Sequence, residues 1–288
     1  MDLTENISAR AARLIPTVAD SNKEQRVVSV TLSMMTQVPQ LAQGLLQLAK
    51  VNVGVRTSIV AFTEVQFKDP VFSGYRPDGL LIVKTGQRVW RALVEAKIGN
   101  AKLDAEQLQN YINIAKAYKI DAVITISNQF TPRADHHPIL TLRRSDARKV
   151  DLFHWSWSWV KTKTQLILDE EKIDDPEQAF LLREFYRFLD HPSTGVQSFT
   201  QMPQEWKPLV TTIRDKVQIK RNAPEVEAVV SAWQQAARHL ALKLTTHVAR
   251  KVNVRLTRAQ QLNQDLWLKE GCAEILKSQI YTIILKIK

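Results

Sequence analysis

Residues 76–98 read RPDGLLIVKTGQRVWRALVEAKI, and this stretch decides the fold class. It contains two segments, Asp78–Lys84 and Arg88–Ile98, that are rich in the β-branched and aliphatic residues typical of strands. The short loop Thr85-Gly86-Gln87 joins them. Two such segments across a short glycine-containing loop predict a β-hairpin.

Side chains alternate between the two faces of a strand. In Arg88–Ile98 the face expected to anchor the strand in a core is wholly apolar and consists of Trp90, Ala92, Val94, Ala96 and Ile98. The opposite face carries Glu95 and Lys97 side by side near the strand end. Pro77 cannot donate a ladder hydrogen bond, so we expect Asp78 at a strand start or bulge. A twisted hairpin could bring Asp78 close to Glu95.

The segments on either side of the hairpin alternate between helix and strand patterns. In chain order we expect a helix from Ser21-Asn22 towards Val38, a helix over Gln40–Lys50, a strand over Ser58–Phe67, a helix over Ala105–Tyr118 capped by Asp104, a strand over Ala122–Ile126, an extended stretch over Val150–Trp157 and a helix starting at Asp175-Pro176. The long connection from Lys97 to Ala122 is a crossover, which permits parallel pairing. A mixed sheet covered by helices, hence an α/β fold, is expected.

The segment Asp190–Pro208 is the best candidate for a domain boundary, because it is rich in proline and lacks periodicity. We therefore expect a first domain at 1–190, a linker at 191–208 and a mostly helical domain at 209–288. In that last domain Glu225–Arg250 has a helical apolar stripe, and Arg250–Arg258 is expected to be extended. Ser278–Lys288 is β-like and needs a partner strand, from this domain, another copy or a longer natural chain.

Composition excludes several classes of protein. The chain has 288 residues, 44% of them hydrophobic, which excludes disorder as the dominant state, and a single cysteine, which excludes a disulfide scaffold. It contains no run of 18 apolar residues, and its start lacks the pattern of a signal peptide. We therefore expect a cytoplasmic protein with no membrane partner.

The charge is basic and unevenly distributed. Lys and Arg number 40 against 29 Asp and Glu, a net charge of +11. Residues 211–288 carry 14 Lys and Arg against 6 Asp and Glu, a net charge of +8 that leaves +3 for residues 1–210. Such a surplus favours polyanionic partners, although Lys and Arg that merely solvate helix faces would produce the same count.

The acids of the hairpin suggest a metal site. Two carboxylates near one another repel unless a cation lies between them. Mg²⁺ prefers oxygen ligands and usually binds one or two carboxylates together with water and phosphate. Lys97 could then orient a water or stabilise developing charge. The alternative is an ordinary strand with ion-paired surface acids.

Asp78, followed after sixteen intervening residues by Glu95-Ala96-Lys97, resembles the motif of the PD-(D/E)XK nuclease superfamily, which includes restriction endonucleases, Holliday-junction resolvases and RecB-like nucleases. That family has a core of a helix, three strands, a helix and a strand, the order expected here over 21–128. The resemblance implies that Asp78 and Glu95 bind Mg²⁺ or Mn²⁺, with the Ala96 carbonyl as a further ligand. It implies that Lys97 is the catalytic lysine.

Three more residues fit the family. Gln107 and Tyr111 lie four apart on one helix face and resemble the Gln-x-x-x-Tyr element of RecB-like members, which helps to hold the nucleic-acid backbone or positions the site. The alternatives are a near capping box for Gln107 and a core position for Tyr111. Glu24 resembles an acid on the first helix that contacts the metal in some members. Its alternative is a glutamate that stabilises the first turn of a helix.

Two other features of the sequence are a pair of histidines and a run rich in tryptophan. His136-His137 has no His or Cys cluster to complete a zinc site and is expected to be a polar loop. The residues from His154 to Trp159 alternate strongly, which predicts a strand with one aromatic face. Those tryptophans could stack on bases, but packing against a neighbouring helix is the favoured interpretation.

Together these patterns predict a metal-dependent DNA endonuclease, a hydrolase acting in restriction, phage (antiviral) defence or DNA repair. The basic C-terminal domain is expected to hold nucleic acid, through Arg250, Lys251, Arg255 and Arg258, or to form a homodimer. One alternative is a catalytically silent nuclease fold that binds nucleic acid or a partner protein. Another is a subunit that is active only within a larger defence or repair assembly.

Overall fold

The chain divides into two compact units. Unit 1 consists of Met1–Asn128 and Ala134–Gln197, and unit 2 consists of Gln129–Arg133 and Ser198–Lys288. The structure is a computed structural model, and it describes residues 3–16, 19, 21–131, 133–139, 150–170, 173–197, 199, 202–220, 223–248, 250–278 and 285–287.

The division after Gln197 falls within 191–208, the stretch expected to be a linker. Both ends of that stretch are nevertheless ordered parts of the units. Pro192–Thr194 forms a 3-10 turn in unit 1, and the first helix of unit 2 begins at Trp206. The sequence did not predict that Gln129–Arg133 would belong to unit 2.

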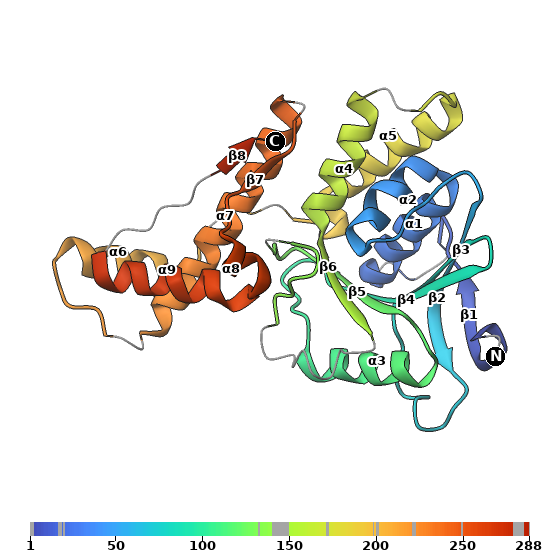
Figure 1. Ribbon diagram of the computed structural model, residues 1–288, viewed down its shortest axis with the longest axis horizontal. Helices are drawn as coiled ribbons and strands as arrows, with labels where there is room; N and C mark the ends of the chain where they lie inside the picture. Colours follow the sequence, from blue (N-terminus) through green and yellow to red (C-terminus); the bar gives the residue numbers. More distant parts are fainter. Residues whose placement is uncertain are drawn as a thin grey trace. The chain divides into compact units, whose positions relative to one another are not determined.

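Unit 1 combines one sheet with helices on both of its faces (Figure 1). In chain order its elements are η1 (Leu3–Asn6), β1 (Ile7–Ala11), α1 (Lys23–Gln37), α2 (Pro39–Leu46), η2 (Gln47–Ala49), β2 (Thr57–Phe67), β3 (Gly79–Thr85), β4 (Arg88–Ala96), α3 (Ala105–Ala117), β5 (Ala122–Ser127), β6 (Asp151–Ser156), α4 (Trp157–Asp169), α5 (Pro176–Asp190) and η3 (Pro192–Thr194).

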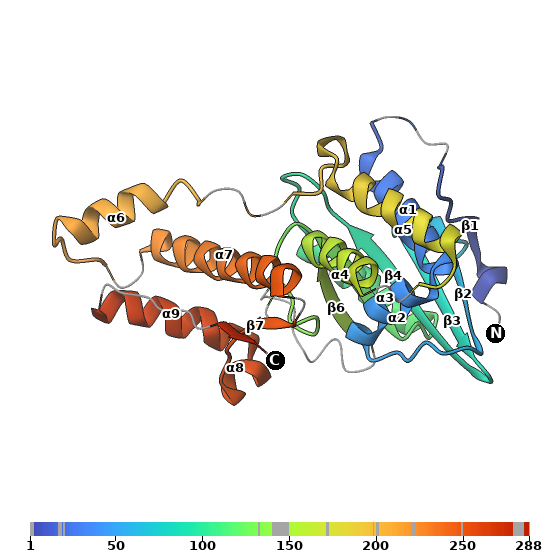
Figure 2. The same ribbon diagram turned by 90° about the horizontal axis from the view of Figure 1, so that it is seen from above.

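The sheet has six strands in the order β1-β2-β3-β4-β5-β6. Neighbours from β1 to β4 are antiparallel, whereas β4–β5 and β5–β6 are parallel. Strands β1 to β4 lie side by side in the view from above (Figure 2). The expected α/β class, mixed sheet and crossover from β4 through α3 to β5 are therefore confirmed.

Side chains of the central strands point alternately to the two faces of the sheet and pack into two separate hydrophobic cores. Val94 and Ile124 pack into the core that includes residues of α1, α2, α4 and α5. Their neighbours Leu93 and Val123 point to the opposite face, into the core under α3. Every residue of β5 is buried, as expected for a parallel strand covered on both faces.

The extended stretch expected at Val150–Trp157 is shorter than predicted. Strand β6 ends at Ser156, whose side chain accepts a hydrogen bond from the Trp159 N–H and so caps α4. The prediction of one aromatic strand face is therefore wrong, because Trp155 lies in a strand and Trp157 in a helix. A serine N-cap can start a helix inside a pattern that otherwise alternates.

Unit 2 is mainly helical and also contains a two-stranded sheet. Its elements are α6 (Trp206–Arg214), α7 (Pro224–Val248), β7 (Val252–Val254), α8 (Arg258–Leu262), α9 (Gln264–Ser278) and β8 (Leu285–Ile287). Strand β8 pairs antiparallel with β7, so the partner strand expected for the C-terminal segment comes from the same unit. Most of that segment, residues 279–284 and 288, lies outside the described residues.

The core of unit 2 is small. It joins Leu209 of α6, three valines of α7 and Ile275 of α9. The apolar stripe predicted along α7 is buried only at its start, since Trp233 and Leu240 are 40% and 50% exposed. Among the helices of the described residues, none is both long and apolar enough to cross a membrane.

A buried polar network lies on the α3 face of the sheet and is centred on Thr125 of β5. The Thr125 hydroxyl lies 2.9 Å from His137 Nε2 and 2.9 Å from His154 Nδ1. The Ile139 N–H donates to His137 Nδ1 at 3.0 Å. Because Nδ1 accepts, the neutral ring carries its proton on Nε2 and donates it to Thr125.

The network adjoins the predicted site. His136 and His137 lie in a loop, as expected, but both side chains are buried. The strand register pairs Thr125 with Glu95 on one side and with His154 on the other, so the three side chains share one face. Burial lowers the pKa of His137 to about 3, and the neighbouring His154 adds to the decrease.

This buried histidine predicts a loss of stability in acid. Between pH 6.5 and about 3 the unfolded chain protonates His137 and the folded chain does not, so the free energy of unfolding falls as the pH falls. Replacing His137 with Gln should cost about 1–3 kcal/mol at pH 7, because polar partners remain buried. It should also flatten the pH dependence, as measured by urea denaturation at several pH values.

The exposed His191 provides a control, and His191→Gln should leave the pH dependence in place. An equally steep loss of stability in His137→Gln and in the wild type would contradict the assignment.

Candidate active site

Asp78 lies immediately before β3. Gly79 pairs with Val94, so Asp78 lies beside Glu95, one step further along the hairpin. The Asp78 carboxylate accepts a hydrogen bond from the Ala96 N–H at 2.8 Å. In an undistorted ladder Ala96 would face Pro77, and the side chain of Asp78 binds the N–H in place of a strand partner.

The residue after Asp78 has to be small. A Cβ built on Gly79 would lie 2.6 Å from Leu32 Cδ1 and 3.2 Å from the Phe62 carbonyl oxygen. A Cβ at this position would force the Leu32 side chain of α1 to move and would lie tightly against the backbone of β2, so packing favours glycine here.

Glu95 is the innermost acid of the group, with only 3% of its surface exposed. Its Oε1 lies 2.7 Å from Lys97 Nζ. Its Oε2 is buried and has no hydrogen-bond partner among the residues that the structure describes. A buried carboxylate oxygen without a partner is costly, and such atoms mark sites where a ligand or ion can bind.

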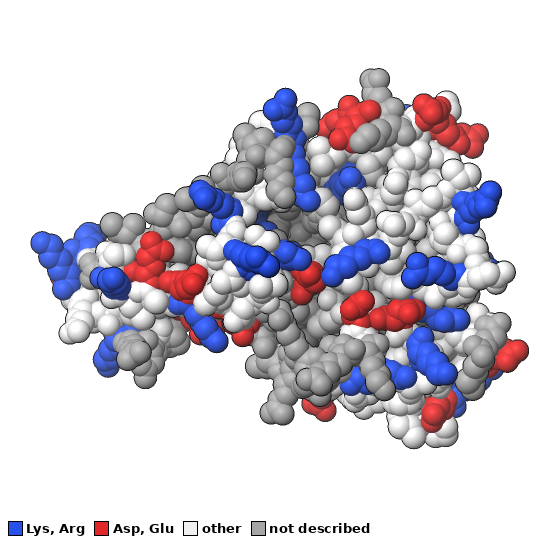
Figure 3. Space-filling view, viewed as in Figure 1, with Lys and Arg blue, Asp and Glu red and all other residues white. Residues whose placement is uncertain are grey.

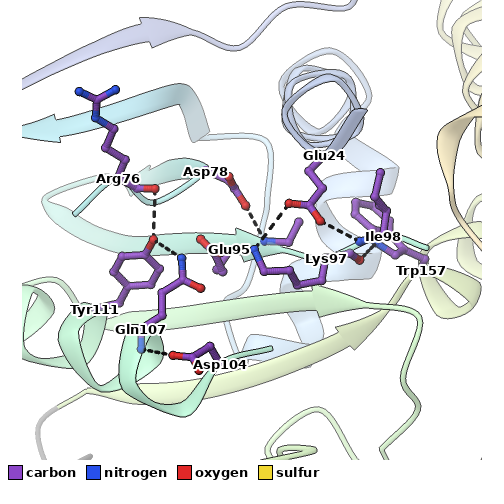
Figure 4. Close-up of polar contacts among 11 residues, drawn as sticks. Glu24, Arg76, Asp78, Glu95, Lys97, Ile98, Asp104, Gln107, Tyr111 and Trp157 are labelled. Atoms are coloured by element: carbon purple, nitrogen blue, oxygen red, sulfur yellow. Dashed lines mark hydrogen bonds and ion pairs between the residues drawn. The ribbon is translucent and has the colours of Figure 1, made fainter. Parts of the chain in front are cut away.

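Helix α1 contributes the third acid. Glu24 lies in the first turn of α1, and its Oε2 is 3.5 Å from Lys97 Nζ. Its Oε1 accepts a hydrogen bond from the Ile98 N–H at 3.3 Å. The structure thus brings Glu24 and Glu95 to one lysine, and the close-up shows Asp78 beside them (Figure 4).

Burial and like charge set the electrostatics of the group. Burial raises the pKa of Asp78 to about 8, and the charge of Glu95 adds to the rise while the Ala96 N–H and Lys97 oppose it. Burial also raises the pKa of Glu95, against the charge and hydrogen bond of Lys97. Burial, the largest single influence, would lower the pKa of Lys97, but the charge and hydrogen bond of Glu95 together with the charges of Asp78 and Glu24 outweigh it, and the net shift is upward.

Gln107 and Tyr111 lie together on α3 and face the same group. Gln107 Nε2 donates to the Tyr111 hydroxyl at 3.0 Å, and this hydroxyl donates to the Arg76 carbonyl at 3.1 Å. Both alternatives considered for these residues also hold, because the Gln107 N–H binds the Asp104 cap and Tyr111 is buried. Burial and the charge of Glu95 raise the pKa of Tyr111, which keeps its hydroxyl protonated.

The fit of a cation can be tested on these side chains. No group of three or more His, Cys, Asp or Glu side chains arranged to hold a metal ion occurs in the described part of the chain. Asp78 and Glu95 nevertheless offer two carboxyl groups with little exposure to solvent, and the buried one, Glu95, has an oxygen without a partner among the described residues. Mg²⁺ needs only one or two carboxylates besides water and phosphate, so the donor set is chemically suitable for it.

The Ala96 carbonyl is a plausible further oxygen donor. In an extended strand the N–H and C=O of one residue point to the same side, and the Ala96 N–H points towards Asp78. Pro77, opposite Ala96 in the continued register, has no N–H to donate to this carbonyl.

The four basic residues expected to contact nucleic acid all lie in unit 2 and do not share one element. Arg250 and Lys251 precede β7, Arg255 follows it and Arg258 begins α8, where Thr257 forms a capping box. The extended stretch expected from Arg250 to Arg258 is therefore limited to Val252–Val254. Lys and Arg are interspersed with Asp and Glu on the face shown in Figure 3, without one continuous basic patch.

Sequence reasoning missed two residues whose side chains bind the backbone at Lys97 and just after it. Trp157 Nε1 donates to the Lys97 carbonyl at 2.9 Å. Asn128 Nδ2 donates to the Gly99 carbonyl at 3.0 Å. Trp157 was assigned to an aromatic strand face, and a single asparagine after a strand has no signal that distinguishes it from a turn residue.

Comparison with known proteins does not identify the chain. No protein-family model matches it, and neither the curated proteins nor the solved structures contain a significant match. The function is therefore inferred from the arrangement of Asp78, Glu95 and Lys97.

The raised pKa of Asp78 predicts that its carboxylate destabilises the protein at alkaline pH. The folded chain holds a proton on Asp78 up to about pH 8, whereas the unfolded chain loses it near pH 4, so stability falls as the pH rises between these values. With EDTA present, Asp78→Asn should stabilise the protein at pH 8.5 by about 1–2 kcal/mol, a rise in Tm of ~2–8 °C, and by less at pH 5.5.

Asp174, an exposed acid, supplies the control, and Asp174→Asn should change Tm little at either pH. A lower Tm for Asp78→Asn than for the wild type at pH 8.5 would show that the carboxylate stabilises the fold.

Proposed function

We propose that this chain is a metal-dependent nuclease of the PD-(D/E)XK type that hydrolyses phosphodiester bonds in DNA. The observation that carries the proposal is the group formed by Asp78, Glu95 and Lys97. A buried acid, Glu95, and a half-buried acid, Asp78, lie next to each other at the adjoining ends of β3 and β4, and one lysine lies 2.7 Å from the deeper acid. Burying like charges is unfavourable for folding, which favours a functional reason for keeping them.

The element order supports the finer assignment of a restriction-endonuclease-like core. Helix α1, the antiparallel strands β2, β3 and β4, helix α3 and the parallel strand β5 come in the order that the resemblance implies, with α2 and η2 inserted between α1 and β2. The acids and the lysine come from the hairpin β3–β4, and Gln107 and Tyr111 come from α3.

Asp78 and Glu95 would hold Mg²⁺ or Mn²⁺, with the Ala96 carbonyl and Glu24 as further oxygen donors. When bound, such a cation lowers the pKa of a coordinated water and neutralises charge on the phosphodiester. The donor chemistry fits, since every candidate ligand is an oxygen atom. Lys97, already paired with Glu95 and Glu24, neutralises part of this negative charge before a cation binds.

Lys97 would act on the reacting phosphate through its charge. A protonated amine at the end of β4 can donate a hydrogen bond to a water or to a phosphoryl oxygen that gains charge in the transition state. Its raised pKa keeps it protonated at neutral pH. Gln107 and Tyr111 would position the site or the nucleic-acid backbone, since both side chains are fixed by hydrogen bonds.

The basic unit 2 suggests a polyanionic substrate. Residues 211–288 have a net charge of +8, which attracts a phosphate backbone over distances of about a Debye length. We propose that Arg250, Lys251, Arg255 and Arg258 contribute to this attraction. A homodimer or a larger defence or repair assembly would extend the binding surface.

Cleavage of plasmid and single-stranded DNA in Mg²⁺ or Mn²⁺ tests the proposal. Glu95→Gln and Lys97→Met keep the shapes of the side chains and remove their charges, and each should lower the cleavage rate at least ~100-fold. Lys102→Ala removes a lysine from an exposed loop and should cleave at close to the wild-type rate.

Equal cleavage by wild type, Glu95→Gln and Lys97→Met would refute a role for these residues. If the wild type does not cleave, calorimetric titration with Mn²⁺ distinguishes the alternatives. A site abolished by Asp78→Ala would indicate a nuclease that needs a partner, and the absence of such a site would indicate a protein that only binds.

A further inference from the structure

Strand β4 ends at Ala96, yet the next three residues are fixed as firmly as a strand. All six backbone N–H and C=O groups of Lys97, Ile98 and Gly99 are hydrogen-bonded. The bonds are Lys97 N–H to the Ile126 carbonyl at 2.8 Å, Trp157 Nε1–H to the Lys97 carbonyl at 2.9 Å, Ile98 N–H to Glu24 Oε1 at 3.3 Å, Ala101 N–H to the Ile98 carbonyl at 3.1 Å, Gly99 N–H to the Gly195 carbonyl at 2.8 Å and Asn128 Nδ2–H to the Gly99 carbonyl at 3.0 Å.

The partners come from segments far apart in the sequence. They belong to α1, to β5 and the residue after it, to α4 and to the turn at Gly195. Gly195 has a φ of 73°, and a Cβ there would lie 3.2 Å from Ile98 Cβ. A side chain at Gly195 would therefore be strained and would push against the segment that follows Lys97. We call Lys97–Gly99 and these partners the clamp.

Trp157 is the member of the clamp that holds Lys97 itself through a side chain. It is fully buried as the first residue of α4, and its indole nitrogen points at the Lys97 carbonyl (Figure 4). That carbonyl defines the peptide plane after Lys97. Without this bond the backbone at Lys97 could shift at the end of β4, and the amine, which lies 2.7 Å from Glu95 Oε1, would shift with it.

We propose that Trp157 is a positioning residue of the active site, which holds the backbone of Lys97 so that its amine stays next to Glu95. The proposal rests on the nuclease function proposed above, because the lysine matters only if the group is catalytic. Trp157 contacts no reacting atom and acts through Lys97. A misplacement of a catalytic group by about 1 Å can cost up to ~100-fold in rate.

Trp155 provides a matched comparison two residues away. It is 1% exposed, against 0% for Trp157, and both side chains belong to the same core. Trp155 Nε1 is buried without a hydrogen-bond partner among the described residues, whereas Trp157 Nε1 is bonded. Replacing each with Phe removes similar packing, but only Trp157→Phe removes a bond to the clamp.

The test compares Trp157→Phe with Trp155→Phe by two readouts. The first is kcat and KM for DNA cleavage in Mn²⁺, where Trp157→Phe should lower kcat about 10- to 100-fold and change KM less than ~2-fold. The second is hydrogen–deuterium exchange of peptides that contain residues 97–99, which should be faster in Trp157→Phe without any metal. Trp155→Phe should match the wild type in both.

A wild-type kcat for Trp157→Phe, or an equal loss of kcat in both variants, would overturn the proposal, since packing alone would then explain the effect. If the wild type cleaves no DNA, the Mn²⁺ titration described above decides on the proposed function, and exchange alone decides whether Trp157 holds the segment. Equal exchange in the two variants would then refute the clamp.

Asn128 allows the same test where Trp157→Phe folds poorly. Asn128 is only partly buried, and Asn128→Ala removes the bonds to the carbonyls of Gly99 and Gly195. It should speed exchange at residues 97–99 and lower kcat with little change in KM. Unchanged exchange and kcat in Asn128→Ala would overturn the clamp as a positioning device.

Discussion

Two carboxyl groups that lie side by side, one buried and one half-buried, impose the main constraint on unit 1. Asp78 and Glu95 are neighbours because Gly79 and Val94 are paired in the β3–β4 hairpin. The fold offsets their repulsion in two ways. The Ala96 N–H binds Asp78, and Lys97 lies between Glu95 and Glu24. The position of α1 and the end of β4 both follow from this requirement.

The surrounding sheet shows how polar groups are tolerated elsewhere in the same layer. In the row across three strands, Glu95 is followed by Thr125 and then His154. Thr125 is hydrogen-bonded to His137 and to His154, and the lowered pKa of His137 keeps that ring neutral, so its burial costs little. Glu95 instead retains an oxygen without a partner among the described residues. The contrast distinguishes a structural polar network from a site suited to an incoming ligand.

Local patterns were sufficient for most of the fold of unit 1. The loop Thr85-Gly86-Gln87 predicts the hairpin, and Asp104 predicts the start of α3. Both features depend on residues close in sequence. The position at which β6 ends could not be predicted, because the serine that caps α4 lies in a run of residues that alternates like a strand. In unit 2 the strand at Val252–Val254 was expected to be longer, although the capping-box pattern Thr257-x-x-Gln260 marks the start of α8 in the sequence.

The candidate site could be predicted as far as the motif extends. Asp78, Glu95 and Lys97 were identifiable because strand alternation and a hairpin relate them directly. The low solvent exposure of the two acids could not be predicted, since an exposed ion pair would have the same sequence pattern. Trp157 and Asn128 were missed for a different reason. Their roles depend on long-range packing, which brings their side chains to the backbone beyond β4.

The clamp also defines what the smallest working piece of this chain can be. A fragment that ends before Trp157 would contain every acid, the lysine, Gln107 and Tyr111, yet it would lack α4 and the turn at Gly195. The Lys97 carbonyl and the Gly99 N–H would then face solvent or remain unpaired. During synthesis the motif leaves the ribosome long before the residues that fix its lysine. The site can therefore be completed only when nearly all of unit 1 has been made.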